Sequence, residues 1–157
     1  MKTIAAVIAA SLVLAACGSD YGDGRGSSSG GGNIATAEAG GQTVLVDGEG
    51  MTLYALSAEK NGKFVCTDSK CLSAWKPVEG KPEGDVDSLS TVKRPDGKEQ
   101  VAYKGEPLYT FSGDKHKGDT NGEGVKDVAT WHAVTVSGKP ASSGGGGGGG
   151  GGGYGGY

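Results

Sequence analysis

A polar loop toward the C-terminal end of the chain holds the residues best suited to bind a metal ion. It spans residues 114–127 and reads DKHKGDTNGEGVKD. Asp119, Asn121 and Glu123 place oxygen ligands on alternate residues and a glycine follows them, as at the start of an EF-hand calcium loop. The twelfth position of that pattern is Thr130 instead of a bidentate glutamate. The loop therefore predicts either a Ca²⁺ site at these three residues or a solvated segment that uses Asp, Asn and Gly for its turns.

The two histidines, His116 and His132, do not form a recognisable metal-binding pair in the sequence. The sequence contains no CxxCH haem attachment, no HExxH motif and no phosphate-binding glycine loop. We therefore expect a protein that is not an enzyme and has no firmly indicated cofactor. A hydrolase with an unfamiliar arrangement of carboxylates is a weaker alternative.

The N-terminal segment predicts export and lipid anchoring. Residues 1–16 contain one lysine and a largely apolar run, residues 4–16, which as a helix would span about 20 Å, short of the roughly 30 Å core of a bilayer. Such a segment is a signal peptide. Residues 14–17, Leu-Ala-Ala-Cys, resemble the lipobox at which bacterial lipoproteins are cleaved and acylated on the cysteine, here Cys17. Gly18 after it is compatible with sorting to the outer membrane in a diderm bacterium.

Glycine-rich segments flank the region that can fold. Residues 17–33 read as a lipidated flexible tether, and residues 141–157 as a disordered Gly/Tyr tail that is either a neutral expansion or an adhesive or spacer segment. Residues 34–140 remain for one modest domain. The formal net charge of −3 and the lack of a basic cluster exclude nucleic acid as an expected partner.

The two cysteines after the lipobox, Cys66 and Cys71, predict a disulfide. An even pair in an exported protein is ordinarily oxidised, and the four intervening residues allow a small closed loop. The loop would hold the segment that leads to Trp75. A redox-active or metal-binding pair is the alternative, but the spacing is not CxxC.

The sequence LYTFSGD at residues 108–114 has an earlier echo, LYALSAE, at residues 53–59. The match continues to Trp75 and Trp131, which follow the tyrosines of the two echoes by 21 and 22 residues. A repeat that preserves both the tyrosine and the tryptophan indicates duplication of one structural unit. Repeat one lies at about 42–79 and repeat two at about 90–137.

Turn residues and alternating apolar residues predict the strands and turns that position these tyrosines and tryptophans. Hairpins are expected around residues 47–50 and 104–105, and a further strand at 91–94 is followed by a Pro-Asp-Gly turn. The segment CLSAW, residues 71–75, is the one short helical turn expected. Together these patterns predict a mainly β, antiparallel domain in which two divergent repeats pack about a pseudo-twofold axis.

Tyr109, Phe111 and Asp114 fit the Tyr-x-aromatic-x-x-Asp motif of a bacterial family of predicted lipoproteins, or secreted repeats of unknown function. The segments CLSAWKPV and GDTNGEG, the latter before Trp131, also resemble that family. The resemblance implies an envelope location and no established activity. In the first copy Glu59 stands in place of the aspartate and a leucine in place of the aromatic residue, so any site in the motif would be intact in the second copy alone.

The sequence as a whole predicts a lipid-anchored, extracytoplasmic binding or structural module of the bacterial envelope, whose partners are the membrane and an envelope protein or small ligand. A redox or electron-transfer accessory that binds a metal or cofactor is the alternative, because buried Tyr and Trp rings are polarizable and carry a polar group. Under either interpretation the candidate ligand-binding residues are Tyr109, Phe111, Asp114 and Trp131.

Overall fold

The computed structural model describes residues 32–137, which form a mainly β domain as predicted. Its elements are β1 (Ala35–Ala39), β2 (Gln42–Val46), β3 (Leu53–Leu56), α1 (Ser69–Ala74), β4 (Trp75–Pro77), β5 (Leu89–Lys93), β6 (Glu99–Tyr103), β7 (Glu106–Pro107), β8 (Tyr109–Phe111) and β9 (Trp131–Ala133). All pairings between these strands are antiparallel. No helix within residues 32–137 has the length and apolar character to cross a bilayer. The predicted signal peptide, Cys17, most of the tether and the tail lie outside the described residues.

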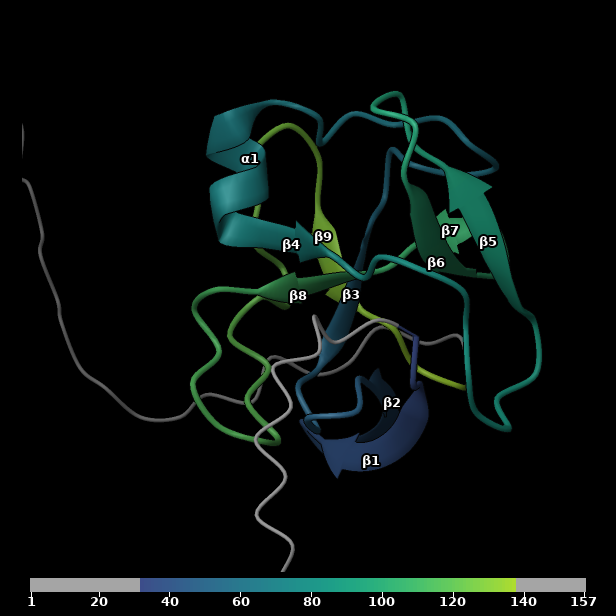
Figure 1. Cartoon of the computed structure of the whole chain (residues 1–157). Coiled ribbons are helices and arrows are strands. Elements are labelled where there is room, and N and C mark those ends of the chain that lie inside the picture. The colour runs from purple at the N-terminus through teal and green to yellow at the C-terminus, as the bar shows by residue number, and fades with distance from the viewer. Residues whose placement is uncertain (1–31, 138–157) are drawn as a thin grey trace, which may run out of the picture.

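The centre of the domain is a four-stranded sheet with the strand order β4, β8, β3, β9 (Figure 1). Its two inner strands, β3 and β8, are the two copies of the echoed sequence. They pair so that Tyr54 lies opposite Tyr109. The outer strands β4 and β9 begin at Trp75 and Trp131. Each copy of the repeat thus contributes one inner and one outer strand to the same sheet.

Apolar side chains cover both faces of this sheet, because successive residues of a strand point to opposite sides. One face carries a cluster that includes Tyr54, Leu56, Trp75, Tyr109 and Trp131. The other carries a cluster that includes Leu53, Ala55, Val78, Val101, Leu108 and Val134. Each cluster draws residues from both halves of the chain, so neither half encloses a core by itself.

Equivalent backbone contacts join the two copies in both directions. The amide of Val134 donates to the carbonyl of Leu53 at 2.8 Å, and the amide of Val78 donates to the carbonyl of Leu108 at 3.0 Å. The sequence match pairs these positions, Leu53 with Leu108 and Val78 with Val134. Such contacts are those expected of a duplicated unit, while the pseudo-twofold axis itself stays a prediction.

Turns at the predicted places connect the strands. β5 and β6 are joined through a turn in which Gly97 has a φ of 88°. β6 and β7 are joined by Lys104 and Gly105, with φ of 50° and 83°, the pair of positive values that gives a tight two-residue hairpin its twist. The hairpin predicted before β3 is also confirmed, since Val46 and Thr52 form an antiparallel bridge.

β1 is not predicted from the sequence. Its residues, ATAEA, contain one β-branched side chain and lie mainly at the surface, so neither propensity nor alternation marks them as a strand. β1 nevertheless pairs along its whole length with β2 through a turn at Gly40 and Gly41. Asn33, which the sequence assigns to the tether, forms a bridge with Glu83. The ordered part of the first half therefore begins earlier than residue 42.

The predicted helical turn, residues 71–75, lies in α1 except for Trp75, which begins β4, and the predicted disulfide joins Cys66 to Cys71, with 5.5 Å between their Cα atoms. The carboxylate of Asp68 caps the helix by accepting hydrogen bonds from the amides of Lys70 and Cys71. α1 runs directly into Trp75 at the start of β4. The cross-link thus closes a small loop just before this buried tryptophan.

Candidate functional site

Tyr54 and Asp114 form a buried hydrogen-bonded pair. The Tyr54 hydroxyl donates to Oδ2 of Asp114 at 2.7 Å, and Oδ1 of the same carboxylate accepts the amide of Asn121 at 3.0 Å. The amide of Gly122 donates to the Tyr54 hydroxyl oxygen at 3.3 Å. The loop that begins at Asp114 is therefore anchored to a tyrosine from the other copy of the repeat.

Tyr109 and Glu59 form a second buried pair. The Tyr109 hydroxyl donates to Oε2 of Glu59 at 2.7 Å, while Oε1 accepts the amides of Val65 and Cys66, both at 2.6 Å. Arg94, itself buried, approaches the Tyr109 hydroxyl with Nη1 at 3.4 Å. The carboxylate of Glu59 thus ties the segment next to the disulfide to a tyrosine of the second copy.

The two pairs exchange partners between the copies of the repeat. Tyr54 of the first copy binds Asp114 of the second, and Tyr109 of the second binds Glu59 of the first. Replacement of the motif aspartate by Glu59 has therefore not removed the tyrosine–carboxylate contact. Glu59 is absent from the residues predicted as candidates, although its offset of 55 from Asp114, the same as between the tyrosines, could have identified it.

Burial raises the pKa of Tyr54, Tyr109 and Asp114. Burial raises the pKa of Tyr54, and the hydrogen bond to Asp114 raises it further. Burial and the negative charge of Glu59 raise the pKa of Tyr109, whereas Arg94 opposes that rise. The pKa of Asp114 is raised by burial against the opposing effect of its hydrogen bonds. Both phenols thus remain protonated donors at neutral pH.

A stack of aromatic rings lies between the two tyrosines. The indoles of Trp75 and Trp131 are parallel within 10°, with centroids 3.8 Å apart. Tyr54 contacts Trp75 edge to face at 5.4 Å, and Tyr109 contacts Trp131 in the same way at 5.1 Å. Phe111 stacks on the outer side of Trp75 at 4.3 Å. The predicted candidates Tyr109, Phe111 and Trp131 therefore belong to one aromatic cluster.

The three predicted Ca²⁺ ligands each bond to a different partner within the domain. The Asp119 carboxylate accepts the amides of residues 115–116, and the Asn121 side chain donates to a backbone carbonyl. Glu123 instead bonds to His132. Among the described residues no three His, Cys, Asp or Glu side chains lie close enough to hold a metal ion. The geometry of the loop therefore matches turn chemistry better than a calcium site.

His132 is held by a buried carboxylate. Its Nδ1 lies 2.9 Å from Oε1 of Glu123, whose other oxygen accepts the amide of Ala133 at 2.7 Å. The side chain of Glu123 is 6% exposed and that of His132 is 39% exposed. No residue within 32–137 hydrogen-bonds Nε2 of His132, so this nitrogen is left to face solvent or a ligand.

His132 lines a surface hollow of about 410 Å³, here called the His132 hollow, between β9, the end of β3 and the β6–β7 turn. Its polar lining consists of Ser57, Lys60, Tyr103, Lys104, Glu106, His132 and Thr135, with Ala55, Leu56, Ala133 and Val134 as the apolar part. Lys60 is paired with Glu106 at 3.3 Å, and the ammonium of Lys104 lies 4.8 Å above the ring of Tyr103. The ionisable side chains that line the hollow are thus one histidine, two lysines and one glutamate.

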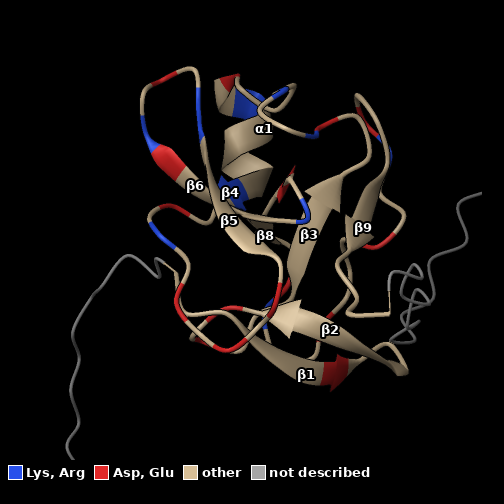
Figure 2. Ribbon diagram, turned by 90° about the vertical axis from the view of Figure 1, so that its right-hand side faces the viewer, with Lys and Arg blue, Asp and Glu red and all other residues tan. Residues whose placement is uncertain are grey.

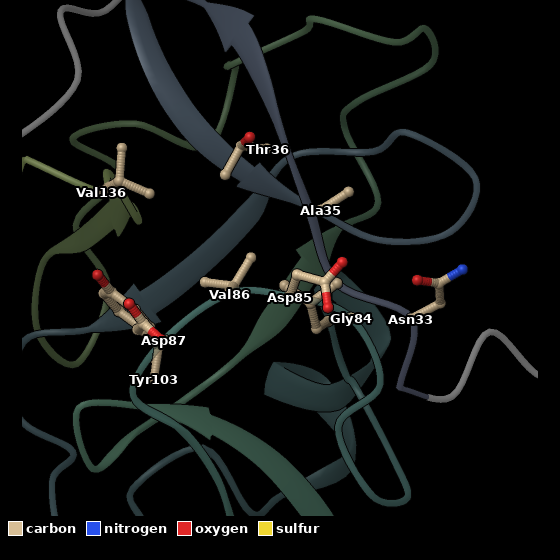
Figure 3. Close-up of a pocket in the computed structure, with 10 residues that line it drawn as sticks. Asn33, Ala35, Thr36, Gly84, Asp85, Val86, Asp87, Tyr103 and Val136 are labelled. Carbon is tan, nitrogen blue, oxygen red and sulfur yellow. The ribbon is translucent and has the colours of Figure 1, made fainter.

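A second hollow, of about 640 Å³, is acidic. It lies between the start of β1 and the loop of residues 78–88, where Figure 3 shows Val86 near the centre and Asp85 and Asp87 beside it. That loop holds four acids and one lysine, and Figure 2 shows acidic segments along the loops near β1. Both Asn33 and Val136, near the two ends of the described residues, contribute to its walls.

No curated protein and no solved structure matches the chain. A family model matches residues 90–135, from β5 to just beyond β9. It includes Tyr109, Asp114 and Trp131, but neither Tyr54 nor Glu59. The resemblance stated from the sequence is thus confirmed over the second repeat, and residues 90–135 match the family described as a secreted repeat of unknown function.

Proposed function

We propose that the protein is a lipid-anchored, extracytoplasmic binding module of the bacterial envelope, without catalysis. The match to a secreted repeat supports the location outside the cytoplasm. The Leu-Ala-Ala-Cys sequence ending at Cys17 supports the lipid anchor. An anchor with more than one acyl chain would hold the domain stably at a membrane surface.

The observation that carries this proposal is the exchange of tyrosine–carboxylate contacts between the copies. Tyr54, Glu59 and Tyr109 are at most 1% exposed, and Asp114 is 6% exposed. Their polar atoms bond to one another or to nearby backbone, so the motif holds the two halves together and does not present open groups to a substrate. Binding must then use side chains outside the motif.

The His132 hollow is the place for this binding. Its volume is in the range of small-ligand sites, which combine an apolar lining with a few polar groups. A buried carboxylate orients His132, and Lys60 and Lys104 add positive charge nearby. This combination suits a small anion such as a carboxylate or phosphate ester.

Titration of the folded, full-length mature protein with acetate and with inorganic phosphate, followed by amide and imidazole NMR shifts, tests the site. We expect saturable shifts at His132 and Lys104, and weaker binding in His132→Gln and Lys104→Gln. His116→Gln is the matched control, since His116 lies in another loop and its side chain is 85% exposed. Shifts that do not saturate, or binding that is equal in His132→Gln and His116→Gln, would refute this site.

A further inference from the structure

The aromatic cluster has the parts of a one-electron donor, and this goes beyond the binding function proposed above. The two indoles are stacked closely enough to share the positive charge left when one electron is removed, and Tyr54 and Tyr109 each touch one of them edge to face. All four rings are at most 1% exposed, so water does not separate them. A positive hole created on either Trp75 or Trp131 therefore has a tyrosine in direct contact.

Oxidation of a tyrosine near neutral pH requires its proton to leave together with the electron. The Tyr54 hydroxyl already donates at 2.7 Å to Asp114. Burial raises the pKa of the Asp114 carboxyl, which makes that carboxylate a better proton acceptor than an exposed aspartate. Because the phenol itself does not ionise at neutral pH, the proton must pass to this carboxylate as the electron departs.

Tyr109 is less suited to the same step, although it has the same kind of partner. The guanidinium of Arg94 lies 3.4 Å from its hydroxyl, and a neighbouring positive charge disfavours loss of an electron. Glu59 also accepts the amides of Val65 and Cys66 on its other oxygen, so both of its oxygens are already engaged. The two tyrosine–carboxylate pairs, alike in geometry, thus differ in their electrostatics.

We propose that the Trp75–Trp131 stack and Tyr54 form a relay that reduces one-electron oxidants, with Asp114 as proton acceptor. An oxidising radical takes one electron from the stack and is itself reduced. Tyr54 then returns one electron to the indoles and transfers its hydroxyl proton to Asp114. The products are a neutral tyrosyl radical, a protonated carboxyl group and indoles restored to their original state.

Flash oxidation of the mature full-length protein by photogenerated tris(bipyridine)ruthenium(III) tests this relay. The protein would carry Tyr21→Phe, Tyr154→Phe and Tyr157→Phe in all samples, which leaves three tyrosines to consider. We expect an indole radical that decays into a tyrosyl radical, observed by transient absorption and by freeze-quench electron paramagnetic resonance. Tyr54→Phe should abolish the tyrosyl signal, while Tyr109→Phe and the control Tyr103→Phe should retain it.

The proton acceptor is tested by Asp114→Asn against the matched change Glu59→Gln. Loss of a positioned proton acceptor should slow formation of the tyrosyl radical by about a hundredfold in Asp114→Asn. Glu59→Gln should leave the rate nearly unchanged. If Asp114→Asn fails to fold, the unaltered aspartate is tested in D₂O, where coupled proton transfer should slow the step. A tyrosyl signal that survives Tyr54→Phe, or no slowing in D₂O, would overturn the proposal.

Discussion

Tyr54 and Tyr109 lie opposite each other on β3 and β8, and each donates its hydroxyl to a carboxylate that belongs to the other copy of the repeat. The short motif that repeats in the sequence is thus completed between the copies, not within either one.

Truncation of either tyrosine should destabilise the domain to a similar degree. Tyr54→Ala and Tyr109→Ala each remove a fully buried ring from the same cluster and leave a carboxylate without its donor. We expect a loss of about 3–5 kcal/mol in the free energy of unfolding for each. Denaturant unfolding followed by tryptophan fluorescence measures this. A loss for one variant several times that for the other would contradict the equivalence of the two positions.

The two tyrosines should also make the fold sensitive to alkali. Since burial raises both of their pKa values, the folded domain keeps phenolic protons that the unfolded chain has lost. This contribution to stability is complete below the ordinary tyrosine pKa of about 10 and declines as the pH rises above it. Thermal unfolding across alkaline pH should show a shallower decline in Tyr54→Phe and in Tyr109→Phe.

Tyr103→Phe is the control for the alkaline experiment, because no carboxylate within residues 32–137 accepts a hydrogen bond from Tyr103. Its pH dependence should follow that of the unaltered protein. An alkaline transition that is the same in all three variants would show that the two buried phenols do not cause it.

Opening of the disulfide should weaken the domain without unfolding it. The loop from Cys66 to Cys71 has six residues with both ends counted, and closing so short a loop stabilises the folded state by about 2 kcal/mol in the chain-entropy estimate. The double variant Cys66→Ala, Cys71→Ala should unfold at lower denaturant concentration than the oxidised protein. Free labelling of both thiols before any reduction would contradict the cross-link.

Replacement of Cys17 should release the protein from the membrane. We expect Cys17→Ala to appear in the soluble fraction or as an uncleaved precursor, without incorporation of labelled acyl chains. The double variant of Cys66 and Cys71 should remain membrane-bound and acylated, since those cysteines serve another purpose. Membrane attachment and acyl labelling that are unchanged in Cys17→Ala would remove the basis for the lipid anchor.

The hairpins of the domain could be predicted because their signals are local. Gly97 and Gly105 occupy positions with positive φ, which glycine adopts without strain, and alternating residues beside them mark the strands. β1 could not be predicted because its alanines carry little strand preference. β1 is held in place by its hydrogen bonds to β2, and this pairing forms only in the folded chain.

The candidate site was predictable only in part. Tyr109 and Asp114 stand in one short motif, and the sequence identifies both. Tyr109 bonds to Glu59, 50 residues away in the chain, and Asp114 bonds to Tyr54, 60 residues away. Nothing in the local sequence specifies these pairings. The burial of Arg94 is equally hidden, since beside a Pro-Asp-Gly turn an arginine would be expected at the surface.

The crossed contacts have a consequence for assembly. A half-chain from residues 32 to about 80 would contain Tyr54 and Glu59 but neither of their partners. The first and second halves can form the crossed tyrosine–carboxylate hydrogen bonds within one molecule. They can also form them between two molecules that swap halves, with the same contacts in both cases. A chain cut in the loop of residues 78–88 should therefore regain its sheet only when both fragments are mixed. Because of the duplication, each half supplies the strands and the hydrogen-bond partners that the other half needs in order to fold.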